Sequence, residues 1–232
     1  MFRYLITSNG DWRTYILSML LTLPVILLSL TVHECAHGIV ADKLGDHTAK
    51  NLGRLTLDPR KHLDPIGFIC MLLFGFGWAN PVPINTRYFK KPKRDMALSA
   101  LAGPIANILL GFVFAILYET EYALVKNITF TSAGTGYYFL TILSDFLFVA
   151  ARLNVYLAVF NMLPIPPFDG SRFFYIFLPT KWYFKVMQYE RYIMLAILVL
   201  LWFGLLTGPL SAISSLILGG MFRLLELLPF FG

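Results

Sequence analysis

The residues best suited to chemistry stand inside an apolar stretch, as the sequence HECAH at positions 33–37. On an α-helix, residues i and i+4 lie on one face about one turn apart, so His33 and His37 can share one metal ion. Glu34 follows His33 by about 100° around the helix axis, which brings its carboxylate within reach of a metal-bound water. This is the arrangement of H-E-x-x-H zinc hydrolases, and it predicts a hydrolytic zinc centre.

The apolar surroundings strengthen the functional interpretation of this short motif. Ionisable groups inside a membrane span are costly and mark functional sites by default. The alternative to a metal site is a polar patch whose groups hydrogen-bond to neighbouring helices. Such a patch carries a large desolvation cost, because three ionisable groups lie within five residues. Cys35 points away from His33 and is expected to be a small packing residue.

The composition requires a membrane. Of the 232 residues, 57% are hydrophobic and 14% are charged, and the mean hydropathy is +0.67, whereas soluble domains average about 25% charged residues. Long charge-free windows predict helices over about residues 14–41, 96–118 and 138–163, and a C-terminal helical pair in 190–228 that breaks at Gly208-Pro209. The predicted fold class is an all-α polytopic membrane protein with about five transmembrane helices. It forms one domain, 1–232, with a three-helix catalytic core over about residues 14–175.

Residues 65–86 also lack charge, but their glycines and prolines favour short extended pieces over a helix. The expectation is a membrane-embedded, β-like re-entrant segment. Irregular backbone at membrane depth is tolerated only where protein buries it or where it lines a wet cavity. The segment therefore hints at a site.

Basic residues predict the orientation. Residues 43–94 contain ten Lys and Arg and residues 172–191 contain four, whereas residues 119–136 contain Lys126 alone. Cytoplasmic loops carry the basic excess, so the N-terminus is expected outside, and the C-terminus and the active site on the cytoplasmic side. The net charge of +6 is thus assigned to topology and lipid headgroups, with no nucleic-acid partner.

A catalytic zinc usually takes three protein ligands and a water. His47 and His62 lie in the basic loop and are expected to be solvated. Asp169 follows NMLPIPPF, whose prolines should end the third helix and hold the carboxylate in irregular backbone, with Gly170 allowing a sharp turn. By topology Asp169 reaches the same side as His33 and His37 and is the predicted third ligand. The alternative is an Asp-Gly turn without a ligand.

Three motifs together resemble the site-2 proteases, which are intramembrane zinc metalloproteases: HECAH, GPIAN at 103–107 and NMLPIPPFDG at 161–170. The stretch RLTLDPRKHLDPIG and GWANPVPIN, within residues 54–85, looks like segments of the compact bacterial and archaeal members without PDZ or CBS domains. The resemblance covers most of residues 28–175. Phe168 departs from it mildly, because Leu is commoner before the Asp-Gly pair.

The resemblance implies one catalytic Zn²⁺ held by His33, His37 and Asp169, with Glu34 as general base. It implies hydrolysis of peptide bonds within or near transmembrane segments of membrane-anchored proteins. The expected partners are the lipid bilayer and single-span substrates such as anti-sigma factors, transcription-factor precursors or remnant signal peptides. The substrate-binding residues so implied are Asn80, Pro81, Val82, Pro83, Asn107 and Asn161.

The residues support part of this assignment. An extended segment with an unpaired edge can bind a substrate strand through main-chain hydrogen bonds. Asn107 and Asn161 can bond substrate or a developing oxyanion, or they can bond between helices. Two other functions stay open. An ion or small-solute transporter would show inverted repeats, which are absent from the sequence; a catalytically silent metal-binding scaffold would lack Glu34 or a ligand.

Overall fold

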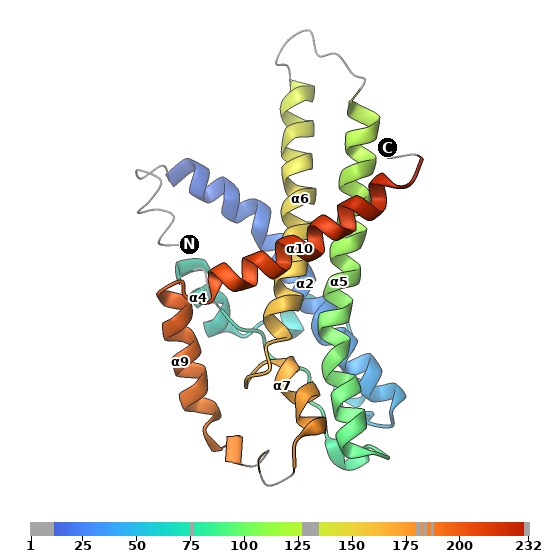
Figure 1. The fold of residues 1–232 in the computed structure, drawn as a ribbon, viewed down its shortest axis with the longest axis vertical. Helices are drawn as coiled ribbons and strands as arrows, with labels where there is room; N and C mark the ends of the chain where they lie inside the picture. The colour runs from blue at the N-terminus through green and yellow to red at the C-terminus, as the bar shows by residue number, and fades with distance from the viewer. Residues whose placement is uncertain are drawn as a thin grey trace. The chain divides into compact units, whose positions relative to one another are not determined.

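The computed structural model describes residues 12–74, 77–126, 135–179, 182, 185–186 and 188–229. Its long helices are α2 (Trp12–Lys43), α5 (Pro92–Val125), α6 (Thr135–Asn161) and α10 (Thr207–Glu226) (Figure 1). The short helices are α3 (Thr48–Asn51), α4 (Pro65–Phe74), α7 (Asp169–Phe174) and α9 (Glu190–Trp202). Three 3₁₀ turns complete the described elements: η1 (Pro59–Lys61), η2 (Thr86–Tyr88) and η3 (Tyr175–Phe177).

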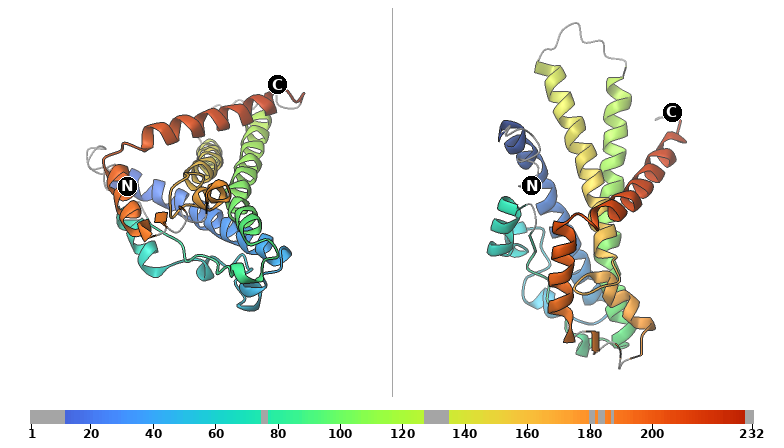
Figure 2. Two further views of the ribbon diagram at one scale, coloured as in Figure 1. Left: turned by 60° about the horizontal axis from the view of Figure 1, so that its bottom comes forward. Right: turned by 60° about the vertical axis from the view of Figure 1, so that its left-hand side comes forward.

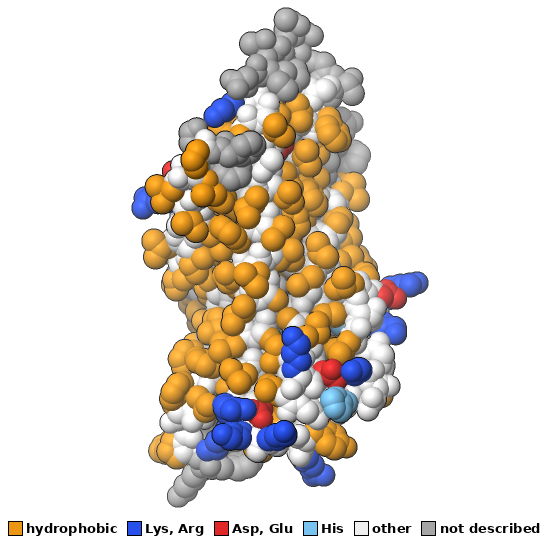
Figure 3. Space-filling model, turned by 90° about the vertical axis from the view of Figure 1, so that its right-hand side faces the viewer, with side chains coloured by type: hydrophobic (Ala, Val, Ile, Leu, Met, Phe, Trp, Pro, Cys, Tyr) orange, Lys and Arg blue, Asp and Glu red, His pale blue; other side chains and the backbone are white. Residues whose placement is uncertain are grey.

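Four of the described helices are long and apolar enough to cross a membrane: Met19–Lys43 of α2, α5, Gly136–Asn161 of α6, and α10. Their outward faces expose large apolar side chains such as Leu20, Leu109 and Leu216, which is the pattern expected for contact with lipid. Figure 3 shows hydrophobic side chains along the helices and Lys and Arg gathered toward one end of that face. The all-α polytopic membrane class is thereby confirmed.

The C-terminal pair differs in detail from the prediction. Helix α9 has 13 residues, about 20 Å of helix, whereas a bilayer core is about 30 Å thick. The break between α9 and α10 falls at residues 203–206, where Gly204 adopts φ 75°. Pro209 lies in the first turn of α10, where the missing N–H costs nothing, so the predicted break at Gly208-Pro209 is wrong.

The prediction that residues 65–86 form no helix is wrong for Pro65–Phe74, which is helix α4. Proline is well suited to the first helical position, and the Asp64 carboxylate accepts a hydrogen bond from the Gly67 N–H at 2.7 Å, satisfying one of the free amides of the first turn. Among the described residues that follow, Gly77 onward is extended, and Ala79 forms an isolated antiparallel bridge with Leu63. The β-like segment is therefore residues 77–85.

The chain divides into two compact units, the first ending at Gly103 and the second beginning at Pro104. In the first unit, α2 contacts α3 and η1. In the second unit, α10 crosses α6 (Figures 1 and 2). The Phe222 ring stacks on Phe148, with centroids 6.2 Å apart, and meets Tyr118 at 5.7 Å.

Candidate active site

The two histidines of HECAH converge on one point beside helix α2. Both are buried, with 4% of His33 and 6% of His37 exposed. Their Nε2 atoms lie 3.0 Å apart, and their rings meet edge to face. Two nitrogens bound tetrahedrally to one zinc at about 2.05 Å lie about 3.3 Å from each other. A shift of about 0.3 Å therefore converts this pair into two ligands of one ion.

The tautomer of His37 is fixed by helix α5. Its Nδ1 lies 2.7 Å from the carbonyl oxygen of Ser99. Because a carbonyl oxygen can only accept, Nδ1 carries the proton, and the Nε2 lone pair is directed toward His33. Metal-binding histidines are held in this way by a carbonyl or carboxylate behind the ring. The Ser99 hydroxyl donates in return to the carbonyl oxygen of His37 at 3.1 Å, so α2 and α5 are tied at this level.

Gly103 on α5 faces the same pair of nitrogens. A methyl group on its Cα would collide with His37 Nε2 and would lie 2.5 Å from Cε1 and 2.6 Å from Nε2 of His33. The absence of a side chain leaves room at the point where the imidazoles converge. Converging Nε2 atoms, a fixed tautomer and this space fit a bound metal, and His33 and His37 belong to the described residues that could hold one.

Glu34 is half-buried and reaches the extended segment. Its Oε2 accepts a hydrogen bond from the main-chain N–H of Val82 at 2.8 Å. Gly38, one turn farther along α2, allows this approach, because a Cβ at Gly38 would lie 3.1 Å from Val82 Cγ1 and would collide with Leu55. The predicted base and the predicted substrate-binding segment are therefore in direct contact.

Several hydrogen bonds fix the extended segment in the first unit. The Asn80 N–H donates to the carbonyl of His62 at 2.7 Å. Arg54 donates to the carbonyls of Asn80 and Pro81 at 2.8 and 3.2 Å. At the far end, the Asn85 N–H donates to the buried carboxylate of Asp46 at 2.6 Å. Nothing in the sequence indicates that Arg54, His62 and Asp46 hold this segment.

The prediction that His62 is solvated is wrong, whereas His47 is exposed as expected. Only 1% of His62 is accessible; its Nε2 lies 2.8 Å from the carbonyl of Thr56 and 3.7 Å from the Cys35 sulfur. Turn η1 carries the chain back toward α2, and this buries the ring. His47 instead pairs with Asp42 at the surface.

The turn before His62 is capped by Asp58, whose carboxylate accepts from both the side chain and the N–H of Arg60. These hydrogen bonds hold the pKa of the Asp58 carboxyl below its ordinary value. Turn η1 is thus stabilised at neutral pH.

The remaining predicted residues lie in the second unit. Asp169 is the first residue of α7, so it stands at a helix start and the expected irregular backbone is confined to residues 162–168. Gly170 is helical and makes no sharp turn, which corrects the prediction. It is small because a Cβ would lie 2.6 Å from the Leu163 carbonyl oxygen. Asn107 is fully buried, and the Asn161 amide donates to the Leu157 carbonyl of its own helix at 3.0 Å.

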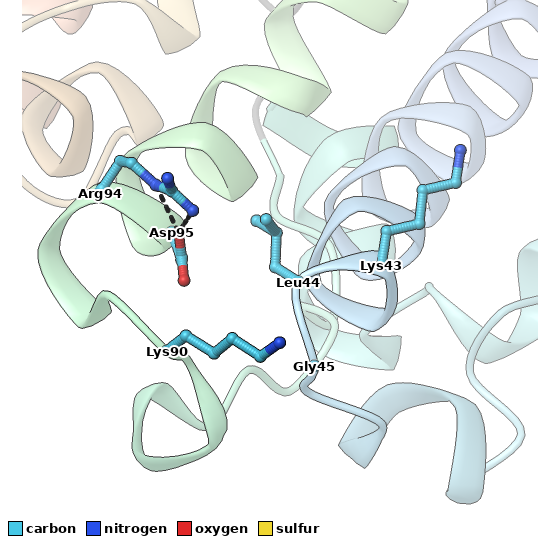
Figure 4. A pocket seen from close by; sticks show the side chains of 6 residues that line it. All are labelled: Lys43, Leu44, Gly45, Lys90, Arg94 and Asp95. Carbon is cyan, nitrogen blue, oxygen red and sulfur yellow. Dashed lines mark hydrogen bonds and ion pairs between the residues drawn. The ribbon is translucent and has the colours of Figure 1, made fainter.

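A cavity of about 280 Å³ lies where α2 ends and α5 begins, in the first unit (Figure 4). Arg94 forms an ion pair in it with the buried Asp95 at 2.7 Å. The cavity carries a net positive charge and includes neither histidine of the HECAH pair. Its lining residues are Lys43, Leu44, Gly45, Lys90, Arg94 and Asp95.

Comparison with known proteins gives a consistent result. The model of Peptidase family M50 matches residues 21–203. The chain is 42% identical over 189 residues to "Putative zinc metalloprotease YwhC" of Bacillus subtilis, covering 80% of this chain and 82% of that protein. It is 30% identical over 160 residues to "Putative zinc metalloprotease MJ0611" of Methanocaldococcus jannaschii, covering 68% and 70%.

A longer relative from the same archaeon, "Zinc metalloprotease MJ0392", is 28% identical over 185 residues, which are 79% of this chain and 42% of that protein. No solved structure matches the chain significantly.

Proposed function

Because this chain belongs to peptidase family M50 and is a zinc metalloendopeptidase of the site-2 protease type, we propose that it cleaves membrane-anchored proteins within or near their transmembrane segments. The observation that carries the proposal is the HECAH site inside a helix long enough to cross the membrane. A protease whose base and metal ligands lie on such a helix meets substrates that share the bilayer. Single-span regulatory proteins and remnant signal peptides are the proposed substrates.

His33 and His37 supply two zinc ligands, and Asp169 is proposed as the third. When bound, zinc acts as a Lewis acid: it polarises the scissile carbonyl and lowers the pKa of a bound water toward about 7. Support for Asp169 comes from its motif, NMLPIPPFDG, and from its place at the start of α7. A His₂-carboxylate set with one open position is typical of catalytic zinc.

Glu34 acts as the general base. It lies on the same helix as the two histidines, next to His33, and its carboxylate takes the proton of the attacking water and later gives it to the leaving amine. The segment 78–85 is proposed to hold the unwound substrate as an added strand. Asn107 and Asn161 are proposed to assist in substrate binding. The amide of Asn161 would have to leave the Leu157 carbonyl of its own helix to do so.

The protein is a multi-pass membrane protein, and we place its active site on the cytoplasmic side. Support comes from the cationic cavity where α2 ends and α5 begins, because basic residues stay in the cytoplasm. The N-terminus is then outside. We propose a cytoplasmic C-terminus, which requires the 13-residue helix α9 to cross the membrane as well as α10. Cysteine labelling at each end of the chain in intact cells tests this orientation.

The decisive experiment is co-expression with a tagged single-span substrate, comparing the wild type with Glu34→Gln. General-base catalysis contributes about 10²–10⁴-fold in rate, so the variant should leave the substrate uncut while keeping its zinc. Glu190→Gln, on α9, is the matched control and should cleave as the wild type does. Persistent cleavage by Glu34→Gln would refute the proposed role.

The ligand set is tested separately by metal analysis. His33→Ala, His37→Ala and Asp169→Ala should each purify with less zinc than the wild type. Full zinc in Asp169→Ala would remove this residue from the ligand set and leave the assignment of the histidines intact.

A further inference from the structure

The segment proposed to bind substrate has very few main-chain donors. Pro81 and Pro83 have no N–H, so between Asn80 and Ile84 the Val82 N–H is the single main-chain donor. The neighbouring Asn80 N–H is already bonded to the His62 carbonyl. A substrate strand paired with the middle of this segment can therefore receive a main-chain hydrogen bond only from Val82.

That single donor is engaged with the catalytic base. The Val82 N–H donates to Glu34 Oε2 at 2.8 Å. A hydrogen bond from an N–H to a carboxylate is about twice as strong as one between neutral groups. It also occupies a lone pair of the carboxylate that must receive the proton of the attacking water.

The contact is built into the fold on both sides. Arg54 donates to the segment, and the His62 carbonyl and the Asp46 carboxylate accept from its Asn80 and Asn85 N–H groups, so both ends are held. Gly38 lets the Val82 side chain lie against α2, and only 6% of Val82 is exposed. The N–H is thus presented to Glu34 by a fixed backbone.

We propose that the Val82 N–H is shared in turn by Glu34 and by the substrate. In the resting enzyme it holds the Glu34 carboxylate away from its role as base. When an unwound substrate pairs with the segment, a substrate carbonyl takes the N–H and Glu34 is released to accept the proton of the water. Val82 is a positioning residue in this scheme, which links strand docking to activation of the base and rests on the proposed function.

Hydrogen–deuterium exchange of the peptide 79–85 tests the proposal without relying on turnover. The matched variants are Glu34→Ala, which removes the acceptor, and Glu34→Gln, which keeps a carbonyl oxygen in its place. The Val82 amide should exchange roughly 10- to 100-fold faster in Glu34→Ala, the size expected for one charge-assisted hydrogen bond. It should stay mostly protected in Glu34→Gln. The Asn80 and Asn85 amides are internal controls and should not change.

A tagged single-span substrate is then added to the Glu34→Ala variant, which lacks the base and therefore does not cleave the substrate. The substrate carbonyl should restore slow exchange at Val82. Equal exchange in Glu34→Ala and the wild type, or exchange that the substrate does not slow, would overturn the sharing of this N–H. Cleavage by Glu34→Gln would instead overturn the proposed function, so the two failures are distinct.

Val82→Pro provides a kinetic test, with Val82→Ala as the comparison that keeps the N–H. Loss of the donor should raise KM roughly three- to ten-fold relative to Val82→Ala, as expected for one hydrogen bond to substrate. Equal KM values in the two variants would contradict the docking step.

Discussion

Adding one methyl group at Gly103 is expected to disable the metal site. The new Cβ would lie 2.6 Å from Nε2 and 2.5 Å from Cε1 of His33, and closer still to His37. Relaxed contacts of this kind are about 3.5 Å, so the rings must retreat by about 0.9 Å. Metal–ligand distances tolerate about 0.2 Å. The required movement is roughly four times larger than the site can absorb.

The affinity for zinc should fall by at least 10- to 100-fold in Gly103→Ala, the range seen when groups that orient ligands are altered. Competition with a chelator of known affinity measures this change, and metal content after purification gives an independent reading. Gly219→Ala is the matched control, since it lies within α10 with open space around it. That variant should bind zinc as the wild type does.

Circular dichroism distinguishes loss of the site from loss of the fold. Alanine is favoured over glycine inside a helix by about 0.5–1 kcal/mol, so Gly103→Ala should retain its helical signal. A Gly103→Ala protein that is folded and binds zinc with wild-type affinity would show that the imidazoles do not converge against Gly103.

Three further predictions concern stability and the support of the site. Ser99→Ala should keep zinc affinity within about three-fold, because the atom that holds His37 is a main-chain oxygen, while loss of the hydroxyl should cost about 1 kcal/mol of unfolding free energy. His62→Ala should lower the unfolding free energy by about 2–3 kcal/mol, whereas His47→Ala at the surface should change it little; denaturant titration in detergent measures these differences. Phe222→Ala should destabilise the contact of α10 with α6 by about 1–3 kcal/mol, and Leu216→Ala, at a side chain that is 78% exposed, should leave the melting temperature nearly unchanged.

The metal-binding half of the site could be predicted because its spacing is local. His33, Glu34 and His37 lie within one helical turn and a quarter, so the geometry of an α-helix alone brings the imidazoles together. The long charge-free windows likewise predicted three of the four long helices, α2, α5 and α6, since about 20 apolar residues are needed to cross the bilayer. The largest error is in α5, predicted over 96–118 but running from Pro92 to Val125, because this helix continues into charged residues at both ends.

The supporting contacts could not be predicted, because their partners are main-chain atoms. The carbonyl of Ser99 holds His37, the N–H of Val82 holds Glu34, and the carbonyl of His62 holds Asn80. Every residue type has a main-chain carbonyl, so the identities of Ser99 and His62 do not predict that their carbonyls hold His37 and Asn80. Each contact also joins residues separated by many positions, which only the folded chain brings together.

Val82 is the exception, because its flanking residues make its N–H distinctive. Two prolines remove the neighbouring donors and leave one N–H at a defined position. From the sequence alone, Pro81 and Pro83 predict only an extended segment. In the structure they also leave the Val82 N–H as the one main-chain donor in the middle of the segment, and this N–H contacts the catalytic base. The same prolines that keep this segment from becoming a helix therefore also make the substrate and Glu34 compete for one donor.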